Sequence, residues 1–124
     1  MCRALRVLCA ALGAERLSTL KRAAVSAYWE LAGGAATLDQ LAEQIALWEP
    51  DVIVADIEIG PEAVSLVREV RPSARLVLAG ATGPVEGADE CVNSLEDVRA
   101  AILGLPRPGG PVGVRPPTEP RRTP

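Results

Sequence analysis

The chain has 124 residues, 48% of them hydrophobic and 23% charged, with a formal net charge of −3 at pH 7. This length suits one small domain, and no stretch approaches the roughly 20 apolar residues that a membrane span needs. Histidine is absent, which excludes Ser-His-Asp and Cys-His catalysis. Cys2, Cys9 and Cys91 lie far apart without metal-ligand spacing. We therefore expect unreactive thiols, a cytoplasmic location and no enzymatic activity.

The first half of the chain alternates between strand and helix patterns. Residues 5–11 (LRVLCAA) are almost all apolar and predict a buried strand. Apolar residues at helical spacing predict a helix over 14–27, and residues 29–33 (WELAG) predict a short edge strand. The clearest helix covers 37–48, where Thr37 opens a capping box and apolar residues form one face.

The second half continues the alternation. Residues 51–56 (DVIVAD) are apolar on both faces, as in a central parallel strand. A helix over 61–70 and a buried strand over 74–80 follow, with a short strand over 90–93 and a last helix over 94–103. This order predicts a three-layer α/β/α domain with a parallel five-stranded sheet and helices on both faces.

We place the domain at residues 4–103. Residues 104–124 are so rich in Pro and Gly that we expect a disordered tail, with a net charge of +3 after Leu103. In parallel sheets the functional edge lies at the carboxyl ends of the strands. Asp56 ends the central strand at that edge. The other positions at this edge are Ala11, Leu12, Gly13, Ala79, Gly80, Ala81, Thr82, Asn93 and Ser94.

The connection before the last predicted strand is short. It consists of TGPVEGAD, residues 82–89. Eight extended residues reach roughly 26–29 Å, enough to return along a strand of roughly 17–20 Å but not to contain a helix. The strand over 90–93 could instead run antiparallel or fail to form. In either case we expect bare sheet and exposed apolar area, which usually marks an interface.

Several of these segments together resemble the receiver domain of two-component response regulators, over roughly residues 5–103. The stretch WELAGGAATLDQLAEQIALWEPDVIVADI is similar to the second strand, second helix and third strand of receivers. ARLVLAGA and GADECV are similar to their fourth strand and the start of their fifth. The resemblance implies a flavodoxin-like or CheY-like fold in which the fourth helix is missing or replaced by a loop.

The resemblance also assigns roles to individual positions. Asp56 occupies the place of the phosphoryl acceptor at the end of the third strand. The other groups of a receiver site are replaced. The magnesium-binding acidic pair falls on Ala11 and Leu12, the hydroxyl that ends the fourth strand on Ala79 with Thr82 nearby, and the lysine of the fifth strand on Ser94. Ser94 is also explained as a helix cap.

The resemblance and its departures predict a degenerate pseudo-receiver in bacterial two-component signalling or transcriptional control. It would act by protein–protein interaction, without phosphorylation of Asp56 and without a cofactor. The partner would be another protein or a second copy, bound at the face left by the missing fourth helix; we expect no direct nucleic-acid or membrane binding. The alternatives are a single-domain response regulator that is phosphorylated on Asp56, with Mg²⁺ held by Asp56, Glu58 and Glu15, or a flavodoxin-like domain that binds a small ligand.

Overall fold

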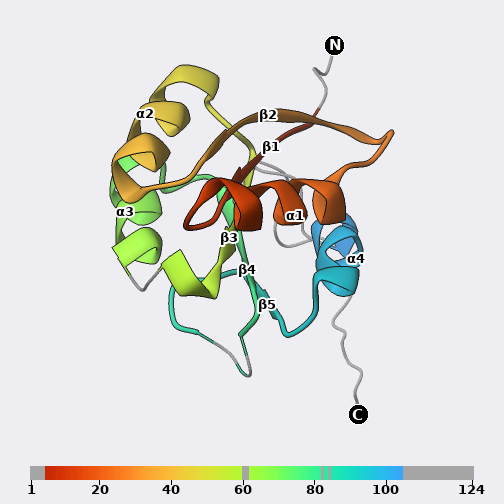
Figure 1. The fold of residues 1–124 in the computed structure, drawn as a ribbon. Coiled ribbons are helices and arrows are strands. Elements are labelled where there is room, and N and C mark those ends of the chain that lie inside the picture. The colour runs from red at the N-terminus through yellow and green to blue at the C-terminus, as the bar shows by residue number, and fades with distance from the viewer. Residues whose placement is uncertain (1–4, 60–61, 82, 84, 105–124) are drawn as a thin grey trace, which may run out of the picture.

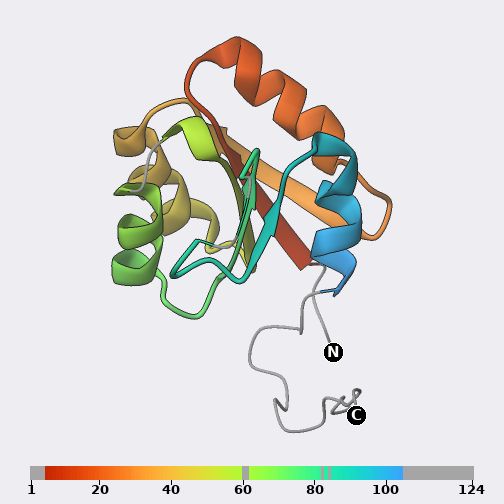
Figure 2. The same cartoon turned by 90° about the horizontal axis from the view of Figure 1, so that it is seen from below.

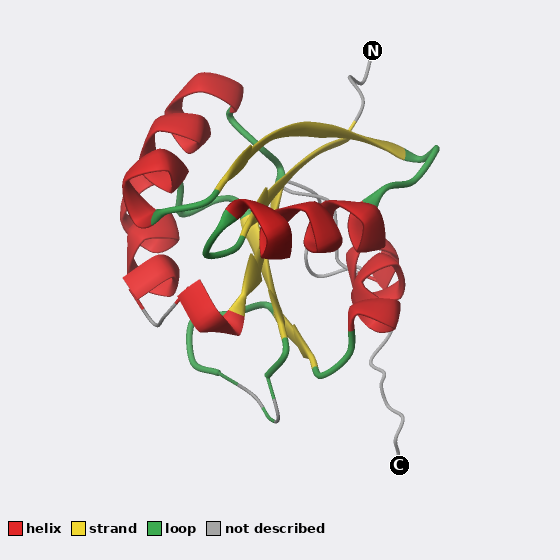
Figure 3. Ribbon diagram, viewed as in Figure 1, coloured by secondary structure: helices red, strands yellow, loops and turns green. Residues whose placement is uncertain are grey.

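The structure is a computed structural model, and it describes residues 5–59, 62–81, 83 and 85–104. The strands are β1 (Leu5–Ala10), β2 (Trp29–Ala35), β3 (Val52–Asp56), β4 (Arg75–Ala79) and β5 (Glu90–Val92). The helices are α1 (Ala14–Ala24), α2 (Leu38–Trp48), α3 (Glu62–Val70) and α4 (Val98–Gly104), with two 3₁₀ turns, η1 (Ile57–Ile59) and η2 (Leu95–Asp97). The predicted alternation of strand and helix is therefore confirmed (Figure 3).

The strands form one parallel five-stranded sheet in the order β2-β1-β3-β4-β5 (Figure 1). The last strand, whose direction the sequence left open, runs parallel to β4, with Cys91 opposite Leu78. At the other edge, β2 shifts its register against β1 between Val7 and Cys9. Gly33 lies opposite that shift with a φ of 77°, a conformation that glycine adopts without steric cost.

Helices cover both faces of the sheet, and each face has its own core (Figures 1 and 2). The three central strands alternate their buried side chains between the faces, so that Val7 and Leu8 belong to opposite cores. One core joins the sheet to α1 and α4, and the other joins it to α2 and α3. Because the chain has no Phe, both cores are built mainly from branched aliphatic side chains and alanines.

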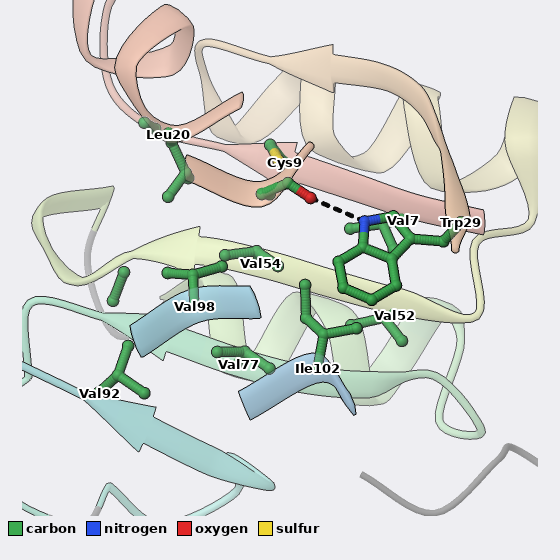
Figure 4. Packing of buried hydrophobic residues seen from close by; sticks show 13 residues of the cluster. Val7, Cys9, Leu20, Trp29, Val52, Val54, Val77, Val92, Val98 and Ile102 are labelled. Carbon is green, nitrogen blue, oxygen red and sulfur yellow. Dashed lines mark hydrogen bonds between the residues drawn. The ribbon is translucent and has the colours of Figure 1, made fainter. Parts of the chain in front are cut away.

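The core beneath α1 and α4 includes the buried Trp29, as Figure 4 shows. Its indole Nε1 donates a 2.7 Å hydrogen bond to the carbonyl of Ala24, the last residue of α1. This bond satisfies the indole N–H and one carbonyl at the end of the helix. Trp29 therefore fixes the end of α1 above the sheet, in addition to filling volume.

The predicted helix caps are confirmed. The Thr37 hydroxyl oxygen accepts a hydrogen bond from the Gln40 N–H at 3.1 Å, and the Gln40 side chain accepts one from the Ala36 N–H at 2.8 Å. Ser94 Oγ accepts a hydrogen bond from the Glu96 N–H at 3.2 Å and caps η2, which leads into α4. The predicted start of α3 at residue 61 lies outside the described residues.

Between β4 and β5, the described residues of the connection contain turns and no helix, as the sequence predicted. The expectation of a bare sheet is wrong, however. The β4 side chains that face this connection, Leu76 and Leu78, are 0% and 1% exposed. Val85 and Ala88 of the connection pack against the core to which both leucines belong. This face of β4 is therefore covered by the connecting loop together with Ala63 and Val67 of α3, which belong to the same core.

The side chain of Arg68 on α3 holds this loop in place. Its guanidinium donates to the Gly87 carbonyl from Nε at 2.9 Å and from Nη2 at 2.7 Å, and to the Asp89 carboxylate at 2.8 Å. It also donates to the carbonyls of Pro72 and Ala74 before β4. One side chain therefore ties together the helix, the start of β4 and the loop.

Candidate functional site

The candidate site lies at the carboxyl end of β3, where Asp56 is the last residue of the strand. Its side chain is 15% exposed. The Oδ1 atom accepts a hydrogen bond from the Glu58 N–H at 3.1 Å, and the Oδ2 atom accepts one from Arg16 Nε at 2.9 Å. Both carboxylate oxygens therefore have donors, one from the backbone of η1 and one from α1.

Arg16 is the residue of this site that the sequence reasoning missed. The chain leaves β1, turns at Gly13 with a φ of 84°, and begins α1 at Ala14, so that Arg16 lies in the first turn of the helix beside Asp56. The hydrogen bond and the negative charge of Asp56 raise the pKa of Arg16. The guanidinium is therefore a permanent cation against the carboxylate.

The positions assigned to the other receiver groups carry no replacement chemistry. Ala11 is fully buried, and Leu12 is 45% exposed with an aliphatic side chain. Ala79, which pairs with Asp56 across β3 and β4, presents a buried methyl group where the resemblance to receivers places a hydroxyl group. Thr82, considered as a substitute hydroxyl, lies outside the described residues.

The Ser94 hydroxyl oxygen accepts the Glu96 N–H and serves as the cap of η2. The next residue, Leu95, borders the cavity that contains Asp56. A capping hydroxyl supplies no positive charge, so Ser94 does not replace the lysine of a receiver site. The structure thus brings a cation to Asp56 from α1 and none from the end of β5.

Glu15 and Glu58 are the two acids predicted to bind a metal ion together with Asp56. Glu15 borders the same cavity of about 440 Å³ as Asp56 and Arg16, and the exposed Glu58 follows in η1. Within the described residues, however, no group of three or more Asp, Glu, Cys or His side chains is placed to hold a metal ion. Because Arg16 also engages the Asp56 carboxylate, these residues do not fit a magnesium ion.

Among the described residues, none of the helices combines the length and the apolar composition that crossing a bilayer requires.

No protein-family model and no curated protein sequence matches the chain. Solved structures do match. The chain is 22% identical to the response regulator domain of CheB from Thermotoga maritima, with a TM-score of 0.64 over 82% of this chain and 92% of that one. It is 18% identical to the signal receiver domain of an HD domain-containing protein from Pseudomonas fluorescens, with a TM-score of 0.66 over 82% and 90%.

A third similar structure is a response regulator receiver modulated diguanylate cyclase from Pelobacter carbinolicus. It is 18% identical, with a TM-score of 0.63 over 80% of this chain and 89% of that one. All three are receiver domains or receiver-containing proteins. The order of the sheet and the helices on both of its faces agree with these matches. The chain therefore has the CheY-like fold of response-regulator receiver domains.

Proposed function

We propose that this chain is a receiver-like signalling module that acts by protein–protein interaction, without phosphorylation of Asp56 and without enzymatic activity. The observation that carries the proposal is the ion pair between Asp56 and Arg16, at a site where Ala11 and Leu12 occupy the positions of the metal-binding acids. We place the module in bacterial two-component signalling or transcriptional control, as the fold suggests.

Phosphoryl transfer to a carboxylate requires a free nucleophilic oxygen in line with the phosphorus atom and positive charge against the phosphoryl oxygens. At this site, Arg16 Nε already hydrogen-bonds Asp56 Oδ2 at 2.9 Å, and the Glu58 N–H occupies Oδ1 at 3.1 Å. The incoming group would have to displace Arg16 and would find no magnesium ligands at Ala11 and Leu12. The site therefore favours a permanently neutralised carboxylate.

The competing function is a working receiver in which Arg16 serves as the cation that holds the phosphoryl group. A guanidinium can neutralise phosphoryl oxygens with two hydrogen bonds. Arg16 is 56% exposed, so it has room to move from the carboxylate to a phosphoryl group. The two functions predict opposite outcomes in one labelling experiment.

The experiment treats the full chain with acetyl phosphate or phosphoramidate and Mg²⁺, and follows the intact mass and the amide NMR spectrum. We expect no phosphorylated species and no response to the phosphoryl mimic beryllofluoride. Asp56→Asn is the matched control for labelling at other residues, and an active receiver treated in parallel shows that the donor works. Labelling of the wild-type chain that disappears in both Asp56→Asn and Arg16→Ala would establish the working receiver and overturn our proposal.

The surface around β5 is the proposed interaction surface, for a protein partner or a second copy. The support is that β5 is three residues long and has a strand neighbour on one side only, an arrangement that favours pairing with another chain. Residues 5–104 contain fifteen acidic and eight basic side chains, a balance that disfavours nucleic acid and anionic membranes. Sedimentation at micromolar concentration tests self-association. A strict monomer that also recovers no partner from a lysate would count against this surface.

A small-ligand function makes a different prediction. A ligand in the cavity beside Asp56 would raise the melting temperature of the wild-type chain and of Asp56→Asn alike, whereas our proposal expects no shift with nucleotides or common metabolites. A thermal-shift series on both chains therefore separates ligand binding from the interaction module.

A further inference from the structure

A second cavity, larger than the one beside Asp56, is lined by residues of β5, of its flanking loops and of α4. It has a volume of about 740 Å³ and runs along β5, between the loop before this strand and α4. We call it the β5 groove. Figures 1 and 2 show β5 as the edge strand opposite to β2, with α4 beside α1 on one face of the sheet. Apolar lining is contributed by Val85, Ala88, Cys91 and Ala101.

The charged side chains that line the β5 groove are all acidic: Asp89, Glu90 and Asp97. The charge of Asp89 is neutralised by two arginines of the domain itself, because Asp89 forms ion pairs with Arg68 at 2.8 Å and with Arg75 at 3.7 Å. Glu90 and Asp97 are exposed and belong to no ion pair among the described residues. The groove thus combines an apolar lining with two unpaired carboxylates, which favours a cationic occupant with apolar groups.

We propose that the β5 groove binds the chain's own basic segment, residues 105–124, whose placement the structure does not describe. This segment contains four arginines and one glutamate, and seven of its twenty residues are proline. Arginines supply charge opposite to Glu90 and Asp97, and proline rings supply apolar surface at a small cost in conformational entropy. The proposed occupant therefore matches both chemical features of the groove.

The position of the segment in the chain supports the same assignment. Residues 105–124 follow Gly104, the last residue of α4, and Ala100 and Ala101 of this helix line the groove. Ala101 and Gly104 are separated by about 4.5 Å along the helix axis, and twenty residues extend over at most roughly 66–72 Å. The segment is tethered beside the groove and has ample length to enter it. Such tethering gives effective concentrations on the order of millimolar.

A second copy of the folded domain is a weaker candidate. The excess of acidic side chains in residues 5–104 would oppose the carboxylates of the groove with more negative charge. Nucleic acid is disfavoured for the same reason. The basic segment avoids both penalties and would compete with any external partner for this surface. This inference goes beyond the proposed function and does not require Asp56 to be unreactive.

The test places a nitroxide on the segment and reads its proximity to the domain by NMR. The full chain carries Thr118→Cys together with Cys2→Ser and Cys91→Ser; Cys9 is fully buried and stays unlabelled. We expect amide signals of Glu90, Asp97 and Ala100 to lose at least half of their intensity, whereas those of α2 keep it. Adding roughly 0.5 M salt should restore the signals, because exposed charges are then screened.

Matched charge variants identify the binding groups. Glu90→Gln with Asp97→Asn should abolish the intensity loss, whereas Asp39→Asn with Glu43→Gln should leave it unchanged, because these exposed acids lie on α2 away from the groove. Equal broadening in α2, no broadening anywhere, or insensitivity to the groove variant would overturn the proposal. Broadening of an unlabelled chain by a labelled one would assign the segment to a second copy and also overturn it.

A second readout uses the natural cysteine in the groove and avoids the spin label. Cys91 is half-buried and lines the groove. A chain with its four tail arginines replaced by serine should react several-fold faster with a neutral thiol reagent at Cys91, and an unchanged rate would contradict the proposal. Both measurements report where the segment lies, whereas phosphodonor labelling reports on Asp56, so either proposal can fail alone.

Discussion

Replacing Arg68 by alanine should destabilise the domain by about 3 kcal/mol. The Arg68 side chain, which is 31% exposed, makes five hydrogen bonds to four residues: Gly87, Asp89, Pro72 and Ala74. The bond to the Ala74 carbonyl is partly buried and counts at about 1 kcal/mol, and the four nearer the surface count at about 0.5 kcal/mol each. This is a large fraction of the roughly 5–15 kcal/mol that stabilises a typical domain.

Urea unfolding followed by tryptophan fluorescence measures this loss, since Trp29 is buried in the core. With a urea slope of about 1.5 kcal/mol per M, the midpoint should fall by about 2 M. Arg68→Lys should lose about half as much, because an ammonium group cannot span the same acceptors. Arg22→Ala on α1 is the matched control. Its side chain makes no hydrogen bond or ion pair in the described residues, so its effect should stay within about 0.5 kcal/mol.

The location of the loss matters as much as its size. In Arg68→Ala the Asp89 N–H, which donates to the Leu76 carbonyl at 2.9 Å, should exchange with solvent faster than amides of β1 and β3. A loss below about 1 kcal/mol, or unchanged exchange at Asp89, would show that the loop is held by its apolar contacts alone. Either result would refute the role that we assign to Arg68.

Three further predictions concern the loop, a cap and a thiol. Gly87→Ala should lower the free energy of unfolding by about 2 kcal/mol, because Gly87 has a φ of 94° and an added Cβ would lie 2.6 Å from Val64 Cγ1. Gly83→Ala is the control and should be neutral in the same urea assay, because its added Cβ would meet nothing within 4 Å. Thr37→Ala should lose about 1 kcal/mol by removing the cap of α2, and an unchanged thermal midpoint would contradict this. Burial raises the pKa of Cys9 from 9.0 to about 12, so this thiol should resist alkylation in the folded chain. The buried neutral thiol of Cys9 contributes fully to the free energy of unfolding below pH 9. This contribution is lost as the pH rises toward 12, by up to about 1.4 kcal/mol per pH unit. Cys9→Ala should lack this part of the alkaline loss of stability, and equal slopes of stability against pH in the two chains would contradict the prediction.

The fold could be predicted because its signals are local and repeat along the chain. The run VIVA before Asp56 is apolar at consecutive positions, a pattern typical of a strand covered on both faces, and it became β3. Thr37 located the start of α2 for an equally local reason. The prediction of an exposed sheet face at β4 was wrong because a connecting loop can bury strand side chains as a helix does. Val85 and Ala88 pack against the core that includes β4, and Arg68, some twenty residues away in sequence, hydrogen-bonds the same loop at Gly87.

The candidate site could be predicted only in part. Asp56 was found because it ends a buried strand, and a strand end in a parallel sheet is a fixed place. Arg16 was missed because its significance depends on the direction in which the first turn of α1 points, which the turn at Gly13 decides. Its neighbour Glu15 was chosen in its place for its carboxylate. The signal that could have identified Arg16 is a cation in the first turn after β1, beside a strand that ends in an acid.

Both departures from a receiver meet at the end of β4. Ala79 lies where a phosphoryl-sensing hydroxyl would be, and the chain that follows would lead into a fourth helix in a receiver. Here Gly80 and Ala81 instead donate their N–H groups to the Val92 carbonyl at 2.8 and 3.1 Å. The described residues Gly80 and Ala81 are thus tied to β5 by their backbone, and neither carries a side chain that could bind a phosphoryl group. A conformational change requires an element with two arrangements that the two sites bias differently. Gly80 and Ala81 are held to Val92 by backbone hydrogen bonds. We therefore expect the state of the β5 groove to be set by what binds to it, and residues 105–124 are the occupant that we propose.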